Sequence, residues 1–336
     1  MTGSGVRVPH HPLTKVSPRQ LISNSLSTMT LHPQAKAYLD YMASNHPMPA
    51  DATIEERRAD VADYLMYAGP MSDEVNTEHT YFTSPTADLH AVIFRPKNVK
   101  PNAPALVYFH GGGWVFSWPL RYAPQMSNIA AETGFVVIGI NYQKAPEHPF
   151  PTPFDDCYAG LLWVEKNAQR FGIDPTKIGV GGDSAGGNLA AAVALKAADT
   201  GDVKLAYQML IYPCLDTNYQ SKSYLDHETG FGLESLGMQW CWSAYVPKEY
   251  FNNKYAIPAR ATSFKDVAPA IIALAEHDVL RDDGANYAIA LEKAGVPVTL
   301  KEYPGMIHGF FGHGFMVEDA YKLRTWLSEQ IIKAVK

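Results

Sequence analysis

Gly182-Asp183-Ser184-Ala185-Gly186 is the most informative segment of this 336-residue sequence. It matches G-x-S-x-G and lies between an apolar segment at 177–181, which predicts a strand, and an Ala-rich segment at 185–199, which predicts a helix. A serine at a sharp strand-to-helix turn leaves no room for side chains two positions away, which explains both glycines. A plain glycine-rich turn could carry the same letters. The strand before it and the helix after it favour a nucleophile at Ser184.

Strands and helices are predicted to alternate on both sides of this turn. Two alternating segments at 75–83 and 89–95 predict an antiparallel hairpin. Continuous apolar segments, typical of strands buried on both faces, follow at 105–109, 135–140, 177–181, 205–211, 269–275 and 298–303. Predicted helices lie at 121–132, 155–170, 185–199, 283–294 and 317–335. The pattern predicts one α/β unit with a mostly parallel sheet of about eight strands flanked by helices.

A second glycine motif, His110-Gly111-Gly112-Gly113-Trp114, directly follows the predicted strand at 105–109. Three consecutive glycines remove every Cβ from the loop, so successive N–H groups can converge on one oxygen, as a tetrahedral oxyanion requires. A phosphate-binding loop is the alternative. It is disfavoured because no Lys-Ser/Thr follows the glycines and no G-x-G-x-x-G helix opening is present.

A serine nucleophile needs a base, and the base needs an orienting carboxylate. In α/β hydrolases these groups follow the serine in the order acid, then histidine, each after a strand. Asp278 follows the predicted strand at 269–275, and His308 follows the one at 298–303. We therefore predict Ser184, His308 and Asp278 as the catalytic residues.

Four neighbouring side chains are alternatives for these roles: Asp282, Asp283, His277 and His313. The two aspartates begin the next predicted helix, where acidic residues commonly serve as caps. His308 is favoured over the other histidines because glycines flank its loop and let it lean over the sheet. A metal site is disfavoured because no H-E-x-x-H or comparable cluster is present, and we expect neither a metal nor a cofactor.

With these motifs the chain resembles the hormone-sensitive-lipase-like branch of the α/β-hydrolase superfamily, the carboxylesterases called bacterial family IV. The resemblance runs from about residue 31 to the C-terminus and is carried by residues 110–114, 141–151, 182–189, 278–282 and 308–310. Two departures are Gln143-Lys144, where the family often has Arg-Leu, and Val279, where it often has Pro. Neither changes a catalytic atom.

The resemblance implies a triad of Ser184, Asp278 and His308. It also implies an oxyanion hole formed by backbone N–H groups of Gly112, Gly113 and Ala185, with Gly111 close by. The expected activity is hydrolysis of short- to medium-chain acyl esters through an acyl-enzyme. An amidase or deacetylase acting on aryl amides is the nearest alternative. A non-catalytic ligand receptor of the same fold is disfavoured because all three triad residues are present.

The resemblance also divides the chain. We expect a partly disordered tail at 1–30, a helical cap formed by 31–70 and by an insertion at 217–255, and a catalytic domain formed by 71–216 and 256–336. Aromatic side chains suggest an apolar acyl pocket, with Trp114, Tyr212 and Phe310 as candidate substrate contacts, although aromatic residues more often pack a core. The family further implies a homodimer formed through the last strand and the C-terminal helix.

The composition restricts the partners. The chain has 28 Lys and Arg against 34 Asp and Glu, a formal charge of −6, so it has no general attraction to nucleic acid or anionic lipid. The apolar segments fall short of the about 18 residues that span a bilayer. Cys157, Cys214 and Cys241 form no CxxC pattern. We expect a small-molecule ester as substrate and, because no hydrophobic leader is seen, a cytoplasmic location.

Overall fold

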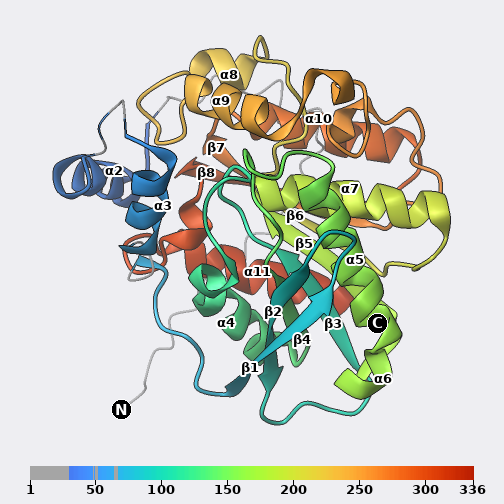
Figure 1. Cartoon of the computed structure of the whole chain (residues 1–336). Helices are drawn as coiled ribbons and strands as arrows, with labels where there is room; N and C mark the ends of the chain where they lie inside the picture. Colours follow the sequence, from blue (N-terminus) through green and yellow to red (C-terminus); the bar gives the residue numbers. More distant parts are fainter. Residues whose placement is uncertain (1–29, 48, 50–51, 64–66) are drawn as a thin grey trace, which may run out of the picture.

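Eight strands form a single sheet in the computed structural model of the chain, which describes residues 30–47, 49, 52–63 and 67–336 (Figure 1). The strands are β1 (Val75–Thr83), β2 (Asp88–Pro96), β3 (Ala103–Phe109), β4 (Val136–Ile140), β5 (Ile173–Asp183), β6 (Gln208–Ile211), β7 (Ala270–His277) and β8 (Val298–Ile307). Their order is β1-β2-β4-β3-β5-β6-β7-β8. Strand β2 pairs antiparallel with β1 and β4, and the other neighbours pair in parallel. The predicted mostly parallel sheet and its antiparallel hairpin are confirmed.

Helices cover both faces of this sheet. The described helices of the chain are α2 (Pro33–Asn45), α3 (Ile54–Asp63), α4 (Ala123–Thr133), α5 (Thr152–Lys166), α6 (Ala168–Phe171), α7 (Ala185–Thr200), α8 (Lys222–Asp226), α9 (Ser235–Tyr245), α10 (Arg281–Lys293) and α11 (Asp319–Ala334), with short 3₁₀ turns at Pro119–Tyr122, Lys248–Tyr250, Pro258–Arg260 and Phe310–Gly312. Helices α5, α7 and α10 share one core with the sheet, and α4 and α11 share the other (Figure 1). Within the described part of the chain, no helix is long and apolar enough to cross a membrane.

Strand β3 shows why two helical layers are needed. Ala105, Val107 and Phe109 belong to the first core, whereas Leu106 and Tyr108 belong to the second. Successive side chains of a strand point to opposite faces, so a continuously apolar strand requires cover on both sides.

The predicted helix at 155–170 is two helices. Helix α5 begins earlier, at Thr152, because Pro153 occupies its first turn, where proline loses no helical hydrogen bond. It ends at Lys166 because the next residue, Asn167, has a φ of −102° and a ψ of 12°, which depart from helical values, and α6 follows. The break turns the chain toward the start of β5.

Helices α2, α3, α8 and α9 lie near the carboxyl ends of the parallel strands (Figure 1). A capping box opens α3: Thr53 N–H donates to Glu56 Oε2 at 2.8 Å, and Glu56 N–H donates to Thr53 Oγ1 at 3.2 Å. The expected tail at 1–30 lies outside the described residues except for Thr30, and residues 64–66 of the expected cap segment at 31–70 lie outside them as well. The division into a cap and a catalytic domain stays a prediction.

Arg58 connects α3 to two segments that follow β3 and β4. Its guanidinium donates to both oxygens of Glu147, at 2.7 and 2.8 Å, and to the carbonyl oxygens of Val115 and Ala145 at 3.0 and 3.1 Å. The pair holds the pKa of Glu147 down, to about 2. One side chain therefore connects α3 to the segment that follows the three-glycine loop.

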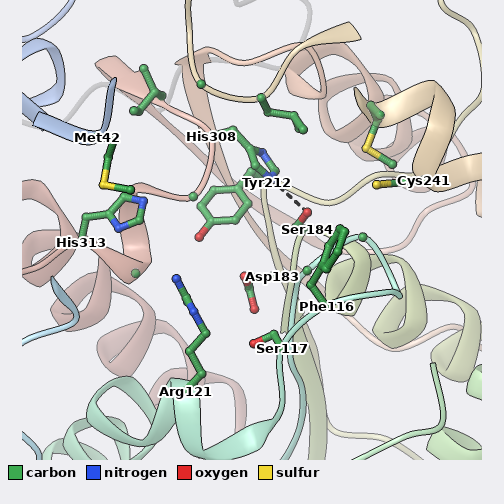
Figure 2. A pocket seen from close by; sticks show the side chains of 18 of the residues that line it. Met42, Phe116, Ser117, Arg121, Asp183, Ser184, Tyr212, Cys241, His308 and His313 are labelled. Carbon is green, nitrogen blue, oxygen red and sulfur yellow. Dashed lines mark hydrogen bonds between the residues drawn. The ribbon is translucent and has the colours of Figure 1, made fainter. Parts of the chain in front are cut away.

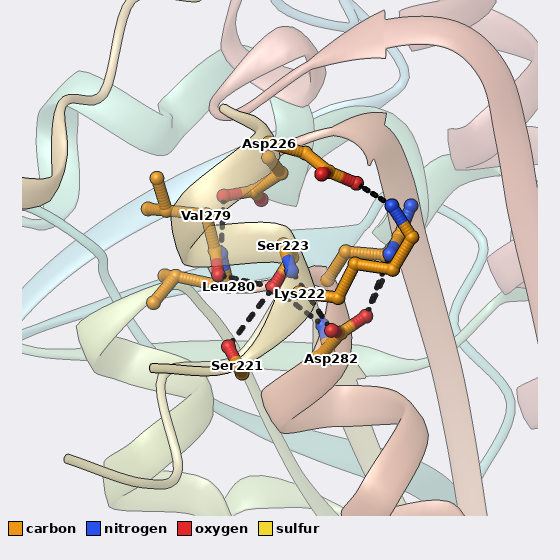
Figure 3. Close-up of polar contacts among 9 residues, drawn as sticks. Ser221, Lys222, Ser223, Asp226, Val279, Leu280 and Asp282 are labelled. Carbon is orange, nitrogen blue, oxygen red and sulfur yellow. Dashed lines mark hydrogen bonds and ion pairs between the residues drawn. The ribbon is translucent and has the colours of Figure 1, made fainter. Parts of the chain in front are cut away.

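Asp282 and Asp283 lie in the first turn of α10 but do not cap it, which corrects the sequence interpretation. Asp282 Oδ2 accepts the backbone N–H of Ser223 at 2.8 Å, and the Ser223 hydroxyl donates to Val279 O at 2.6 Å (Figure 3). Asp283 Oδ2 accepts the N–H groups of Leu215 and Asp216, both at 3.1 Å. Both buried carboxylates therefore accept hydrogen bonds from backbone N–H groups within residues 215–223, which are distant in the sequence. No local sequence pattern indicates these hydrogen bonds.

Candidate active site

Ser184 lies at a strained turn between β5 and α7. Its φ of 55° and ψ of −120° are unfavourable for a residue with a side chain. A Cβ on Gly186 would lie 1.9 Å from Phe109 O, and a Cβ on Gly182 would lie 2.3 Å from Gly186 O. The expected reason for both glycines is confirmed: backbone fills the space that a side chain would need.

The structure brings Ser184, His308 and Asp278 together. The Ser184 hydroxyl lies 2.9 Å from His308 Nε2 (Figure 2), and His308 Nδ1 lies 2.7 Å from Asp278 Oδ2. The β7–β8 register, which pairs His277 with Ile307, places the two partners after adjacent strand ends. A carboxylate only accepts hydrogen bonds, so Nδ1 carries the proton and Nε2 faces the serine as an acceptor.

Asp278 is held by a second contact. Its Oδ1 accepts the backbone N–H of Leu280 at 2.9 Å, and its side chain is buried. Both carboxylate oxygens therefore have partners, which fixes the rotamer that faces His308.

The alternative histidines do not contact Ser184. His313 lines the same cavity but stacks on Tyr38, with ring centroids 3.9 Å apart. His277 is buried between His227 and Phe231, with ring centroids 5.3 and 5.2 Å away. Of the candidate bases, His308 alone has a hydrogen bond to Ser184 within the described part of the chain.

The buried His227 predicts acid sensitivity. Burial lowers the pKa of His227 to about 4, and the neighbouring His277 adds to the effect. In the unfolded chain a histidine titrates near 6.5, so the unfolded state binds the proton more readily. The contribution of neutral His227 to the free energy of unfolding is therefore complete above about pH 6.5 and is lost as the pH falls toward 4. We expect His227→Phe to remove about 1–3 kcal/mol of the acid-induced loss in unfolding free energy, measured by urea denaturation at pH 7 and 4.5.

The exposed His148 supplies the control. His148→Phe should leave the difference between the two pH values as it is in the wild type. An equal pH dependence in His227→Phe and in the wild type would contradict the prediction.

The three-glycine loop adopts a conformation that needs glycine. Gly112 and Gly113 have φ of 110° and 58°, and a Cβ on them would lie 2.5 Å from Phe116 O and 2.6 Å from Cys241 Sγ. Gly112 O accepts the N–H groups of Val115 and Phe116, which closes the loop. Ala185, the first residue of α7, has an N–H without an intrahelical acceptor.

Gly111 departs from the expected oxyanion set. Its N–H donates to Asp183 Oδ1 at 2.9 Å and is therefore turned to a carboxylate instead of a substrate oxygen. Asp183 also accepts the hydroxyls of Tyr108 and Tyr122, at 2.8 and 3.0 Å. Burial raises the pKa of Asp183, and these hydrogen bonds oppose the rise. Asp183 thus connects the nucleophile turn to the glycine loop, a role missed from the sequence although it is the variable residue of G-x-S-x-G.

His110 supports the loop from below and is not a base. Its ring stacks on Tyr142, with centroids 4.4 Å apart, and the Tyr142 hydroxyl donates to His110 O at 2.8 Å. Burial holds the pKa of His110 well below the usual value, so the ring stays neutral.

A cavity of about 420 Å³ opens above Ser184 (Figure 2). Tyr212 lines it as predicted, but Trp114 and Phe310 do not. Trp114 is fully buried against Tyr245 and Trp242, at 4.3 and 4.6 Å between ring centroids, and Phe310 is buried beside Tyr303. Both aromatic residues belong to the core, the commoner place for such side chains.

Several residues of the cavity wall could not be named from the sequence because they come from distant segments. Helix α2 supplies Tyr38, Leu39 and Met42, and the region of α9 supplies Leu233, Met238 and Cys241. Phe116, Ser117 and Arg121 follow the glycine loop. The helical spacing of Tyr38, Leu39 and Met42 was the available signal. Among the residues that the structure describes, no group of three or more His, Cys, Asp or Glu side chains could hold a metal ion.

A serine at the strand-to-helix turn after β5, with its histidine and carboxylate partners after β8 and β7, defines the class of α/β hydrolases. A model of the family described as alpha/beta hydrolase fold matches residues 106–312. The chain belongs to this family, in its hormone-sensitive-lipase-like branch, as the sequence predicted.

Similar proteins agree with this assignment. A carboxylesterase of Mycobacterium tuberculosis, NlhH, is 36% identical over 69% of this chain and 74% of its own length. An ethyl acetate hydrolase of Pseudomonas putida is 31% identical over 87% of this chain and 95% of its own length. A solved ester hydrolase from the metagenome of Lake Arreo, in complex with a bipyridine phosphonate derivative, has a TM-score of 0.86 and 32% identity, covering 90% of this chain and 99% of its own.

Proposed function

We propose that the protein is a serine carboxylesterase that hydrolyses short- to medium-chain acyl esters through an acyl-enzyme on Ser184. Carboxylic ester hydrolysis is the activity of its relatives, and the chain is a carboxylic ester hydrolase. The observation that supports the mechanism is the series of hydrogen bonds from Ser184 through His308 to Asp278 at the floor of a cavity.

In the proposed first half-reaction, Ser184 Oγ bonds to the ester carbonyl carbon while His308 Nε2 takes its proton. The carbonyl oxygen becomes an oxyanion, which the N–H groups of Gly112, Gly113 and Ala185 stabilise. His308 then protonates the leaving alkoxide oxygen as the C–O bond breaks, and Asp278 stabilises the imidazolium.

Water repeats the sequence in the second half-reaction. His308 takes a proton from water, the hydroxide oxygen bonds to the acyl carbon, and Ser184 Oγ leaves with the proton that His308 returns. The net reaction consumes one ester and one water and releases a carboxylic acid and an alcohol.

The cavity supports a preference for acyl chains of moderate length. Its volume of about 420 Å³ lies toward the lower end of the about 300–1,000 Å³ usual for small-molecule pockets. We expect kcat/KM on p-nitrophenyl esters from C2 to C16 to peak between C4 and C8 and to fall at least about tenfold by C12, since carbon atoms beyond the cavity gain no burial. A maximum at C12 or longer would overturn the preference.

Met42 supplies a variant that reports on the cavity wall. Met42→Ala should shift the optimum toward longer chains, and Met71→Ala, which truncates an exposed methionine, should not. Turnover of a matched aryl ester and anilide separates the esterase from the amidase alternative. The cytoplasmic location and the homodimer through β8 and α11 stay predictions.

A further inference from the structure

The cavity above Ser184 has a polar wall that ester hydrolysis by the triad does not use. Ser117 and Arg121 line the cavity beside Asp183 (Figure 2). Met42, Leu233 and Met238, by contrast, provide an apolar lining. A substrate that fills this cavity therefore meets a cation and a hydroxyl as well as apolar side chains.

Both polar side chains are more than nine-tenths buried: 7% of Ser117 and 9% of Arg121 is exposed. Ser117 Oγ has no hydrogen-bond partner within the described part of the chain. A buried hydroxyl without a partner is costly, and such groups in native proteins commonly mark a bound ligand or water. A Cβ on Gly112 would lie 3.1 Å from Ser117 Cβ, so the hydroxyl is carried next to the glycine loop.

The positive charge of Arg121 reaches the cavity wall. After burial, which is the larger cause, Arg121 helps to lower the pKa of His313 to about 3, so that ring stays neutral. Arg121 also lies over the Tyr122 ring, 5.6 Å from its centroid, and has further interactions. A guanidinium offers five N–H donors, so an incoming carboxylate can share it with these contacts.

Asp183 is the carboxylate that also lines this wall, and its charge is already hydrogen-bonded within the protein. It accepts hydrogen bonds from Tyr108, Tyr122 and the Gly111 N–H. These three hydrogen bonds offset its charge, and one of the donors, Tyr122, lines the cavity as well.

We propose that Arg121 and Ser117 form a carboxylate-binding subsite, so that the preferred substrates are esters that carry a free carboxylate. The inference rests on the proposed function, because Ser184 is the group that cleaves the ester. The substrate carboxylate is bound and not transformed. Ester and water are converted to acid and alcohol, and the remote anion only orients the ester toward the nucleophile.

The test compares substrates in which a carboxylate is replaced by an isopropyl group of the same shape. Ethyl hydrogen succinate against ethyl 4-methylpentanoate places the charge in the acyl part. Acetoxyacetate against isobutyl acetate places it in the alcohol part. In pH-stat assays at pH 7 the wild type should prefer the charged member of at least one pair by about 10- to 100-fold in kcat/KM, mainly through KM. The pair in which the charged ester is preferred shows whether the subsite lies on the acyl side or the alcohol side of the ester bond. A preference for the neutral member in both pairs, or none in either, would overturn the proposal.

Variants assign the preference to residues. Arg121→Met should lower the charged-to-neutral ratio of kcat/KM at least about tenfold, and Ser117→Ala about threefold. Arg170→Met removes the same charge from an exposed position on α6 and should leave the ratio as in the wild type. An undiminished ratio in Arg121→Met would refute the assignment. If that variant does not fold, Arg121→Lys and Ser117→Ala give the same decision, since neither should retain the full ratio.

Binding to Ser184→Ala separates this proposal from the catalytic one. Calorimetry with the charged and neutral members of the preferred pair requires no turnover. Tighter binding of the charged ester would support the subsite even if Ser184 were not the nucleophile, whereas equal binding would refute the subsite and leave the catalytic proposal intact.

Discussion

Ser184→Ala is expected to reduce kcat on a short p-nitrophenyl ester by about 10⁴- to 10⁶-fold, because removal of a serine nucleophile leaves only oxyanion stabilisation and substrate binding. The fold should persist, since the Ser184 hydroxyl lies in the cavity wall and its side-chain hydrogen bond is with His308. The relevant measurements are steady-state rates and a thermal unfolding curve on the same preparation.

Two further results make this measurement decisive. Ser243→Ala, at an exposed position on α9, should retain wild-type activity. A burst of p-nitrophenol that is stoichiometric with enzyme should appear in the wild type if deacylation limits the rate, and should be absent from Ser184→Ala. Full activity in Ser184→Ala would refute the proposed mechanism.

Asp278→Asn is expected to reduce kcat by about 10⁴-fold, since an amide in place of the carboxylate favours the wrong tautomer of the catalytic imidazole. In the structure Asp278 Oδ2 lies 2.7 Å from His308 Nδ1. A side-chain amide at this position that donates to Nδ1 would force the imidazole proton onto Nε2. Nε2 faces Ser184 Oγ and, once protonated, could not accept the hydroxyl proton. The readout is kcat at pH 7 and pH 9, together with the unfolding free energy.

The matched control is Asp266→Asn. Asp266 is exposed with a φ of 59°, a conformation that asparagine also tolerates, so activity and stability should stay near the wild type. If Asp278→Asn retained more than about a tenth of wild-type kcat, the orienting role of Asp278 would have to be abandoned.

Features with a local cause could be predicted from the sequence. The turn at Ser184 needs glycine on both sides because backbone atoms fill that space, and the three-glycine loop needs positive φ. The carboxyl ends of parallel strands meet at one edge of the sheet, so Asp278 and His308 could be placed near Ser184 from the positions of their strands alone.

Features with a non-local cause could not be predicted. Trp114 was a candidate substrate contact, but its side chain packs on Tyr245 in the core. Its backbone has a φ of 60°, which the sequence pattern did not indicate. The sequence predicted Gly111 as an oxyanion donor, but its N–H donates to Asp183, which lies 72 positions away in the chain. The cavity wall draws on α2 and α9, and its shape depends on how those helices pack.

The contacts of Asp282 and Asp283 have a mechanical consequence. The two carboxylates hold the chain at Leu215, Asp216 and Ser223, and they follow Asp278 closely in the sequence. Lifting residues 215–223 away from the sheet would break these hydrogen bonds or drag the loop that orients His308. Residues 215–223 are thus held in place beside the Asp278 loop. The side chains that α2 and α9 contribute to the cavity wall do not take part in these hydrogen bonds, so we expect a widening of the cavity for substrate entry to involve α2 or α9 before residues 215–223.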